Sequence, residues 1–263
     1  MNDYLEFAQK TARSAGKALM RHFGKLKQIR LKEDDSVVTE ADTHAERLIR
    51  TAIRRAWPGH RILGEEEGLD ENKSEFTWVI DPLDGTTNFA SGFPFFAVSI
   101  GLFQGRRPVL GIIYDPHRKE CCWAIEGQPA FCNGETIRVS KRGPVTTSTV
   151  AGFGSLWAGA RDRRIPERIL RKAKGRNLGS CVLHLAAVAR GQMDFAVMER
   201  VHLWDFAAAG FILVQAGGKL TGLDGKNLFP LKQPFEAFAK AEVSIVASNA
   251  RLHRQVLTEF VGE

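Results

Sequence analysis

The chain of 263 residues is 44% hydrophobic, so it can bury a large core as one big domain or two closely packed ones, which excludes a disordered protein. Its formal charge of +7 suits an anionic ligand, either a phosphorylated metabolite or nucleic acid. The basic run at 161–176 is, however, more typical of a solvated helix face. No apolar run approaches the roughly 20 residues that cross a membrane, and residues 1–25 lack a secretory layout, which predicts a cytoplasmic protein without a membrane anchor.

Two amphipathic helices and a group of short strands are predicted before residue 142. Apolar residues at spacings of three or four indicate a helix over 3–23, which Gly24 ends. A second helix begins at Thr39, where Asp42 completes a capping-box pattern, and stops at Pro58-Gly59. The predicted strands are 61–64, 77–81, 95–103, 108–115 and 120–125. Turn-forming residues at 104–107 and 115–118 favour antiparallel pairing of the last three.

Helices and strands alternate in the rest of the chain. Helices are predicted near 164–174, 181–190 and 205–216, with a final one after Asn249. Strands are predicted at 194–198, 219–221 and 242–247. This pattern predicts a layered α+β or α/β sandwich in two halves, residues 1–142 and 143–263.

The four cysteines are Cys121, Cys122, Cys132 and Cys181. They lack the paired C-x-x-C spacing of a structural zinc site. We expect reduced thiols, most of them buried.

An acidic motif, Asp81-Pro82-Leu83-Asp84-Gly85-Thr86, follows a strongly apolar run. Pro82 cannot donate to a sheet ladder, so we expect the strand to end there and the two carboxylates to converge. Gly85 permits close approach of the backbone to a ligand, and a helical turn starting at Thr86 offers free N–H groups to an anion. Hard oxygen ligands beside an anion site indicate a Mg²⁺ ion that the protein shares with a phosphate. The alternative interpretation of this motif is an aspartate-capped turn that binds no metal.

Three further acidic positions strengthen the metal interpretation. Glu65 belongs to a triplet of glutamates after a short strand, where an acid can point toward the same strand ends. Taken alone, Asp205 fits a helix N-cap and Asp42 fits a first-turn acid. Their joint occurrence favours one divalent-ion site.

The motifs together resemble the inositol monophosphatase family of Mg²⁺-dependent, lithium-sensitive phosphatases. The matching stretches are VTEAD (38–42), GEE (64–66), WVIDPLDGTTNF (78–89), GS (179–180), WDFAAAG (204–210) and AGG (216–218). The resemblance implies an α+β fold, the layered αβαβα sandwich of the inositol monophosphatase and fructose-1,6-bisphosphatase type, and a homodimer.

The resemblance also implies a role for each matched residue. One metal would be held by Glu65, Asp81 and the Leu83 carbonyl, a second by Asp81, Asp84 and Asp205, and a weaker third ion near Glu65. Thr86 with Asp42 would orient the attacking water. The substrate contacts would be Asp84, Gly85, Thr86, Ser180, Cys181, Glu199 and Asp205. Lys32 corresponds to a lysine near the metals, and Cys181 departs from the alanine more usual at its position.

The implied reaction is hydrolysis of a phosphate monoester by a metal-activated water, with inositol 1-phosphate as the first substrate. Histidinol phosphate, fructose 1,6-bisphosphate and 3′-phosphoadenosine 5′-phosphate are alternatives, and Glu199 discriminates among them because a carboxylate can accept from a polyol hydroxyl or pair with an amine. An alternative of another class is a protein that binds RNA or a transcription complex on a phosphatase scaffold. Nucleic acid is disfavoured because the aromatics lie mostly in apolar runs rather than beside basic residues.

Overall fold

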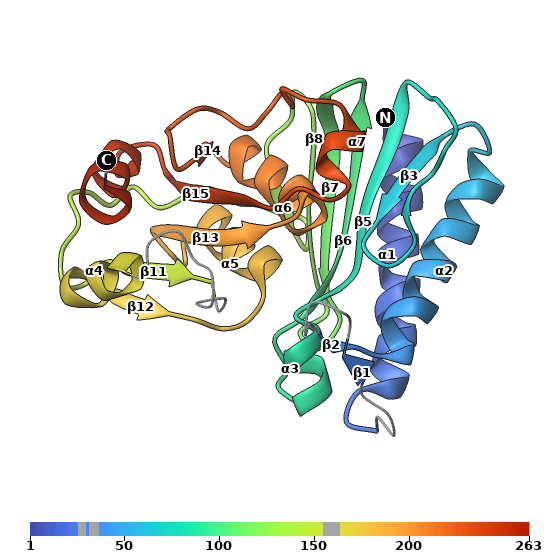
Figure 1. The fold of residues 1–263 in the computed structure, drawn as a ribbon, viewed down its shortest axis with the longest axis horizontal. Coiled ribbons are helices and arrows are strands. Elements are labelled where there is room, and N and C mark those ends of the chain that lie inside the picture. Colours follow the sequence, from blue (N-terminus) through green and yellow to red (C-terminus); the bar gives the residue numbers. More distant parts are fainter. Residues whose placement is uncertain (26–29, 32–36, 155–163, 263) are drawn as a thin grey trace.

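The structure is a computed structural model that describes residues 1–25, 30–31, 37–154 and 164–262. Five layers are stacked in the order helix, sheet, helix, sheet, helix (Figure 1). Helices α1 and α2 cover one face of an eight-stranded sheet, α5 and α6 lie between this sheet and a five-stranded one, and α4 and α8 cover the far face. The predicted αβαβα sandwich is therefore confirmed. Among the described helices, none has the length and apolar character that a membrane span requires.

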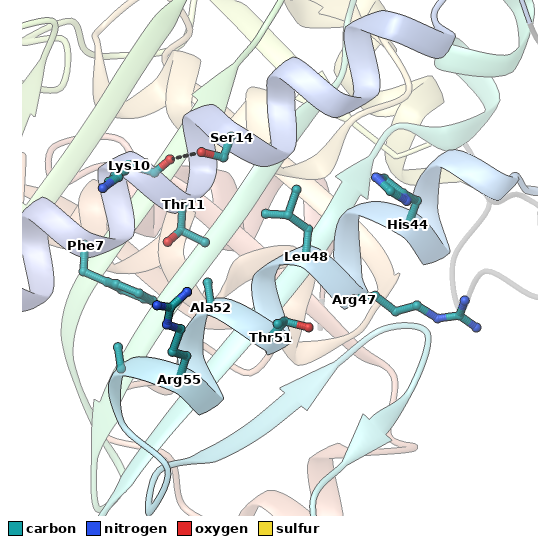
Figure 2. A pocket seen from close by; sticks show the side chains of 11 residues that line it. Phe7, Lys10, Thr11, Ser14, His44, Arg47, Leu48, Thr51, Ala52 and Arg55 are labelled. Atoms are coloured by element: carbon teal, nitrogen blue, oxygen red, sulfur yellow. Dashed lines mark hydrogen bonds between the residues drawn. The ribbon is translucent and has the colours of Figure 1, made fainter.

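The outer helix layer follows from the predicted periodicity. Helix α1 (Asn2–His22) buries alanines on one face, and Gly24 follows with a left-handed φ of 71°. Helix α2 (Glu40–Ala56) starts at Thr39, and Asp42 completes the capping box as predicted. A groove of about 820 Å³ between these two helices is lined by apolar side chains, such as Phe7, and by the cations Lys10, Arg47 and Arg55 (Figure 2).

The large sheet has the strand order β10-β9-β8-β7-β6-β5-β3-β4. Its strands are β3 (Arg61–Gly64), β4 (Gly68–Leu69), β5 (Phe76–Asp84), β6 (Ala97–Gln104), β7 (Arg107–Asp115), β8 (Glu120–Ile125), β9 (Phe131–Cys132) and β10 (Glu135–Thr136). The pairing is antiparallel except between β3 and β5, and so the predicted antiparallel arrangement of β6, β7 and β8 is confirmed. Strands β1 (Arg30–Leu31) and β2 (Val37–Val38) form a separate pair.

Strand β5 corrects one prediction, because it does not end at Pro82 but continues to Asp84. Its register against β6 shifts between Asp81, opposite Ser99, and Asp84, opposite Ala97. This irregularity accommodates a proline that has no N–H to donate.

The expectation of four reduced cysteines is wrong, because Cys122 and Cys132 form a disulfide. The register of β8 and β9 places these two residues directly opposite each other, a pairing that needs the two-residue strand β9. Cys121 and Cys181 are free thiols.

The second half of the chain supplies the middle helices and the small sheet. The helices are α4 (Arg164–Lys172), α5 (Cys181–Ala189), α6 (Leu203–Gln215), α7 (Phe235–Phe238) and α8 (His253–Val256), which continues as the π-helical turn η1 (Leu257–Val261). The small sheet is ordered β12 (Lys174–Arg176), β11 (Val150–Phe153), β13 (Phe195–Val201), β15 (Val243–Asn249) and β14 (Gly218–Gly222). In the basic run, 161–163 lies outside the described residues, and the described part includes the exposed Arg171 and Lys172 on α4.

Close packing of α6 on the large sheet sets the position of its first turn. A Cβ added at Gly111 of β7 would lie 2.7 Å from the Ala208 carbonyl oxygen and 3.2 Å from its Cα. The small residues of WDFAAAG and the glycines of the sheet therefore let the two backbones approach, which holds Asp205 near the end of β5.

Candidate active site

Three carboxylates gather where β5 ends and α6 begins. One oxygen from each of Asp81, Asp84 and Asp205 lies within 4.8 Å of the others. Asp81 is 1% exposed and Asp84 is 7% exposed, while Asp205 is half-buried. Such a group of buried like charges requires protons or a cation to compensate it.

The irregular end of β5 turns the first two carboxylates toward one point. Asp81 Oδ1 accepts a hydrogen bond from the Leu83 N–H at 2.9 Å, which closes a tight turn around Pro82. Gly85 follows with a φ of 90°, and a Cβ there would lie 2.9 Å from the Phe95 carbonyl oxygen. Helix α3 (Thr86–Ser91) then starts at Thr86, as predicted.

Asp84 lies against the N-terminus of α5, in the other half of the chain. The Ser180 hydroxyl donates to Asp84 Oδ2, and the N–H groups of Cys181 and Val182 lie 3.2 Å from its two oxygens. Ser180 is also the N-cap of α5, accepting from the Leu183 N–H at 3.1 Å. Ser180, expected as a substrate contact, is thus placed as a partner of Asp84.

Asp205 is in the first turn of α6 but is not the N-cap. His202 occupies the cap position, and its N–H donates to Asp205 Oδ2 at 2.7 Å. The His202 ring stacks on Trp204 with centroids 4.6 Å apart. The N-cap interpretation of Asp205 is therefore wrong in detail, because the carboxylate caps from the third helical position.

Asp42 and Thr86, 44 residues apart in sequence, meet beside the carboxylates. Thr86 Oγ1 lies 2.9 Å from both Asp42 Oδ1 and the Leu83 carbonyl oxygen, so its single proton has two acceptors. The other Asp42 oxygen accepts from the Thr39 hydroxyl at 2.6 Å and the Thr39 N–H at 2.8 Å. The capping box of α2 therefore fixes the carboxylate that faces Thr86.

The pKa values express the crowding of negative charge. Burial, followed by the Glu65 and Asp84 carboxylates, raises the pKa of Asp81 well above its ordinary value. Burial raises the pKa of Asp84 to about 7, against the opposing hydrogen bond from Ser180. Burial also raises the pKa of Asp42, and burial with the charge of Asp205 raises that of the Cys181 thiol. Glu65 and Cys181 therefore lie within electrostatic reach of the cluster.

Two expected residues are not placed against the carboxylates by a described contact. Glu199 lies on β13 beside Arg200, whose φ of 56° marks the irregular stretch between Met198 and Val201. Glu199 Oε1 is buried. Lys32 lies outside the described residues.

Asn88 joins the two halves at the site and was missed by sequence reasoning. Its Nδ2 donates to the carbonyl oxygens of Phe95 and Leu178, both at 2.7 Å. A Cβ at Gly179 would lie 2.9 Å from the Asn88 amide, and the φ of Gly179 is 75°. The asparagine in the GTTN motif is the signal that could have found it.

The chain belongs to the inositol monophosphatase family, which it matches over residues 1–262. It is 36% identical to a fructose-1,6-bisphosphatase/inositol-1-monophosphatase of Thermotoga maritima, over 97% of this chain and 94% of that one. It is also 36% identical to the Nus factor SuhB of Pseudomonas aeruginosa, over 98% and 96%. The solved inositol monophosphatase of Thermotoga maritima has the same fold, with a TM-score of 0.87, 34% identity and coverage of 98% and 96%.

Family membership, together with the acidic cluster, makes this chain a metal-dependent phosphoric monoester hydrolase.

Proposed function

We propose that this enzyme hydrolyses the monoester of a small phosphorylated polyol, with inositol 1-phosphate as the first substrate, using two or three Mg²⁺ ions. The observation that carries the proposal is the convergence of Asp81, Asp84 and Asp205 within 4.8 Å. Fructose 1,6-bisphosphate, histidinol phosphate and 3′-phosphoadenosine 5′-phosphate are the alternative substrates of the same site.

The donor atoms fit Mg²⁺ by their chemistry. All are hard oxygens from the buried Asp81 and Asp84 and the half-buried Asp205, and the Leu83 carbonyl adds a neutral oxygen beside them. Glu65 is the further ligand, since its charge acts on both Asp81 and Asp84. When bound, the ions lower the pKa of a water and offset charge on the departing ester oxygen.

Thr86 and Asp42 orient the attacking water. With its proton directed to Asp42 Oδ1 at 2.9 Å, the Thr86 hydroxyl presents a lone pair that can accept a proton from that water. Burial raises the pKa of Asp42, which makes this carboxylate a better proton acceptor than an exposed aspartate. The dyad therefore aligns the nucleophile and receives its proton.

The substrate is held by backbone and side chains from both halves. The Gly85 and Thr86 N–H groups bind phosphate oxygens, and the left-handed Gly85 lets the backbone approach them. The carboxylates of Asp84 and Asp205 lie together at the same site. On the alcohol side of the substrate, Glu199 accepts hydrogen bonds from polyol hydroxyls and Cys181 packs against the polyol ring. Ser180 acts mainly through its hydrogen bond to Asp84.

The proposal includes inhibition by Li⁺, a homodimer, a cytoplasmic location and a division into residues 1–142 and 143–263. The first half carries Asp42, Glu65, Asp81 and Asp84, and the second carries Asp205. Both halves are therefore needed for one complete site.

The test is a phosphate-release assay over the four named substrates, with Mg²⁺ or EDTA and with or without Li⁺. We expect Mg²⁺-dependent release that is fastest with inositol 1-phosphate and that Li⁺ suppresses. Equal phosphate release in EDTA and in Mg²⁺ would contradict the role of the metal. Faster turnover of another ester would mean that this ester, and not inositol 1-phosphate, is the preferred substrate.

A second candidate function is binding of RNA. The basic rim of the groove between α1 and α2, with Lys10, Arg47 and Arg55, favours it, as does the relative named as a Nus factor. A salt-titrated RNA-binding assay with the double variant Arg47→Glu/Arg55→Glu separates this function from phosphate release. Loss of RNA binding in that variant with unchanged phosphatase activity would support it.

A further inference from the structure

A buried charged pair on α2 lies directly beneath the loop that carries Glu65. Both residues lie on the helix face that packs into the core, so Glu46 is 0% exposed and Arg50 is 1% exposed although both carry a charge. Glu46 Oε1 accepts from Arg50 Nε at 2.8 Å, one helical turn away. Burial of such a pair is unfavourable unless further hydrogen bonds satisfy its remaining atoms.

The further partners of Glu46 are backbone amides of the glutamate loop. The Glu66 N–H donates to Oε2 at 2.8 Å and the Glu67 N–H donates to Oε1 at 2.9 Å. Both amides immediately follow Glu65, so one rigid carboxylate fixes the backbone on its C-terminal side.

Arg50 ties down the far end of the same loop. Its Nη1 donates to Asp70 Oδ1 at 2.8 Å, and its Nη2 donates to the Gly68 carbonyl oxygen. The planar guanidinium fork thus links Glu46 to the end of the loop with fixed geometry. The loop from Glu66 to Asp70 is held at both ends by two side chains of one helix.

The backbone on the other side of Glu65 is shaped around the same carboxylate. Gly64 has no side chain, and a Cβ there would overlap the Glu46 carboxylate, lying 2.7 Å from its Cδ. The glycine of GEE is therefore required by close approach of Glu46 and not by an unusual φ. Residues 64, 66 and 67 are all fitted to one buried glutamate.

We propose that Glu46 is a positioning residue for Glu65, with Arg50 as its support, and that the pair sets the metal affinity of the site. This inference rests on the proposed role of Glu65 as a metal ligand. A carboxylate ligand on a loop must be held within fractions of an ångström, and residues behind the ligands commonly alter metal affinity by about 10- to 100-fold when they are changed. The same helix carries Asp42, so α2 aligns the metal loop and the water-orienting acid together.

The test is calorimetric titration of the metal-free full chain with Mn²⁺, together with its melting temperature in EDTA. The variants are Glu46→Gln, Arg50→Lys and Glu65→Gln. The matched control is Arg54→Gln, which removes another arginine that contacts Asp70, at 3.2 Å, but has a 56% exposed side chain and no described contact with Glu46. In Glu46→Gln, the amide nitrogen of the new side chain faces a backbone N–H or Arg50, where an acceptor is needed.

We expect Glu46→Gln to weaken Mn²⁺ binding about 10- to 100-fold and Arg50→Lys about 10-fold, with Arg54→Gln within about twofold of the unaltered chain. The proposal is overturned if Glu46→Gln lowers the melting temperature in EDTA yet binds Mn²⁺ within twofold of the unaltered chain, because the pair is then only structural. If Glu46→Gln does not fold, Arg50→Lys decides by the same criterion. If Glu65→Gln also leaves Mn²⁺ binding unchanged, the proposed metal site itself fails, an outcome distinct from failure at Glu46 alone.

Discussion

Asp84→Asn should stabilise the metal-free protein at high pH, because it removes one charge from a buried like-charged cluster. Burial raises the folded pKa of Asp84 from 3.8 to about 7, so the folded chain binds this proton more tightly than the unfolded chain. The resulting contribution to the free energy of unfolding is fully present below pH 3.8 and is lost as the pH rises to about 7.

The magnitude follows from that difference of about three pH units. At about 1.4 kcal/mol per unit, keeping Asp84 ionised above pH 7 costs about 4 kcal/mol. The asparagine loses one hydrogen bond from the Ser180–Val182 segment, worth about 1 kcal/mol, which leaves a net gain of about 3 kcal/mol. For a chain of this size, that corresponds to about 6 to 12 °C in melting temperature.

The assay is thermal unfolding in EDTA at pH 8 and pH 5, followed by circular dichroism. At pH 5 most of the cost is already relieved by protonation, so the gain should shrink to about 2 °C or less. The control is Asp115→Asn, a buried aspartate that pairs with Arg118 at 2.7 Å and whose loss should destabilise at pH 8. A lower melting temperature for Asp84→Asn at pH 8, or an equal gain at both pH values, would refute the reasoning.

Three further predictions concern single contacts. Thr86→Ala should lower kcat at least about a hundredfold, because it removes the hydroxyl between the water and Asp42. The calorimetric Mn²⁺ affinity of this variant should stay within about twofold. A kcat near that of the unaltered enzyme would exclude the proposed role of Thr86 and Asp42. Asp205→Asn should not lower the melting temperature in EDTA, since Oδ1 of asparagine can still accept from the His202 N–H and one charge leaves the acidic cluster. The variant should need about tenfold more Mg²⁺ for half-maximal rate. A collapsed melting temperature with normal Mg²⁺ dependence would favour a purely capping role. Cys122→Ser should lower the free energy of unfolding by about 2 to 3 kcal/mol, because the disulfide closes a segment with a sequence separation of 10. Dithiothreitol should lower the melting temperature of the unaltered chain but not that of the variant.

Local signals predicted much of the fold and some of the site geometry. Apolar spacing and the Thr39–Asp42 pattern predicted α1 and α2 to within a few residues, because both signals act within one or two helical turns. The bounds of β8 were predicted without error. The convergence of Asp81 and Asp84 also follows from residues adjacent in sequence.

Features that depend on long-range packing were not predictable in the same way. The Cys122–Cys132 disulfide depends on the register of a two-residue strand, and the continuation of β5 past Pro82 depends on its neighbour β6. The sequence around Glu46 does not show that its carboxylate binds a loop about 20 residues away. It offers one hint, because Glu46 and Arg50 form a charged i, i+4 pair on the helix face that also buries Ala45, Ile49 and Ile53.

Anomalous diffraction from crystals grown with Mn²⁺ tests most directly whether the chain assembles a divalent-ion centre from its two halves. We expect a peak within about 2.5 Å of carboxylate oxygens from Asp81, Asp84 and Asp205. Strong Mn²⁺ peaks only elsewhere on the molecule, with none beside these three carboxylates, would contradict it.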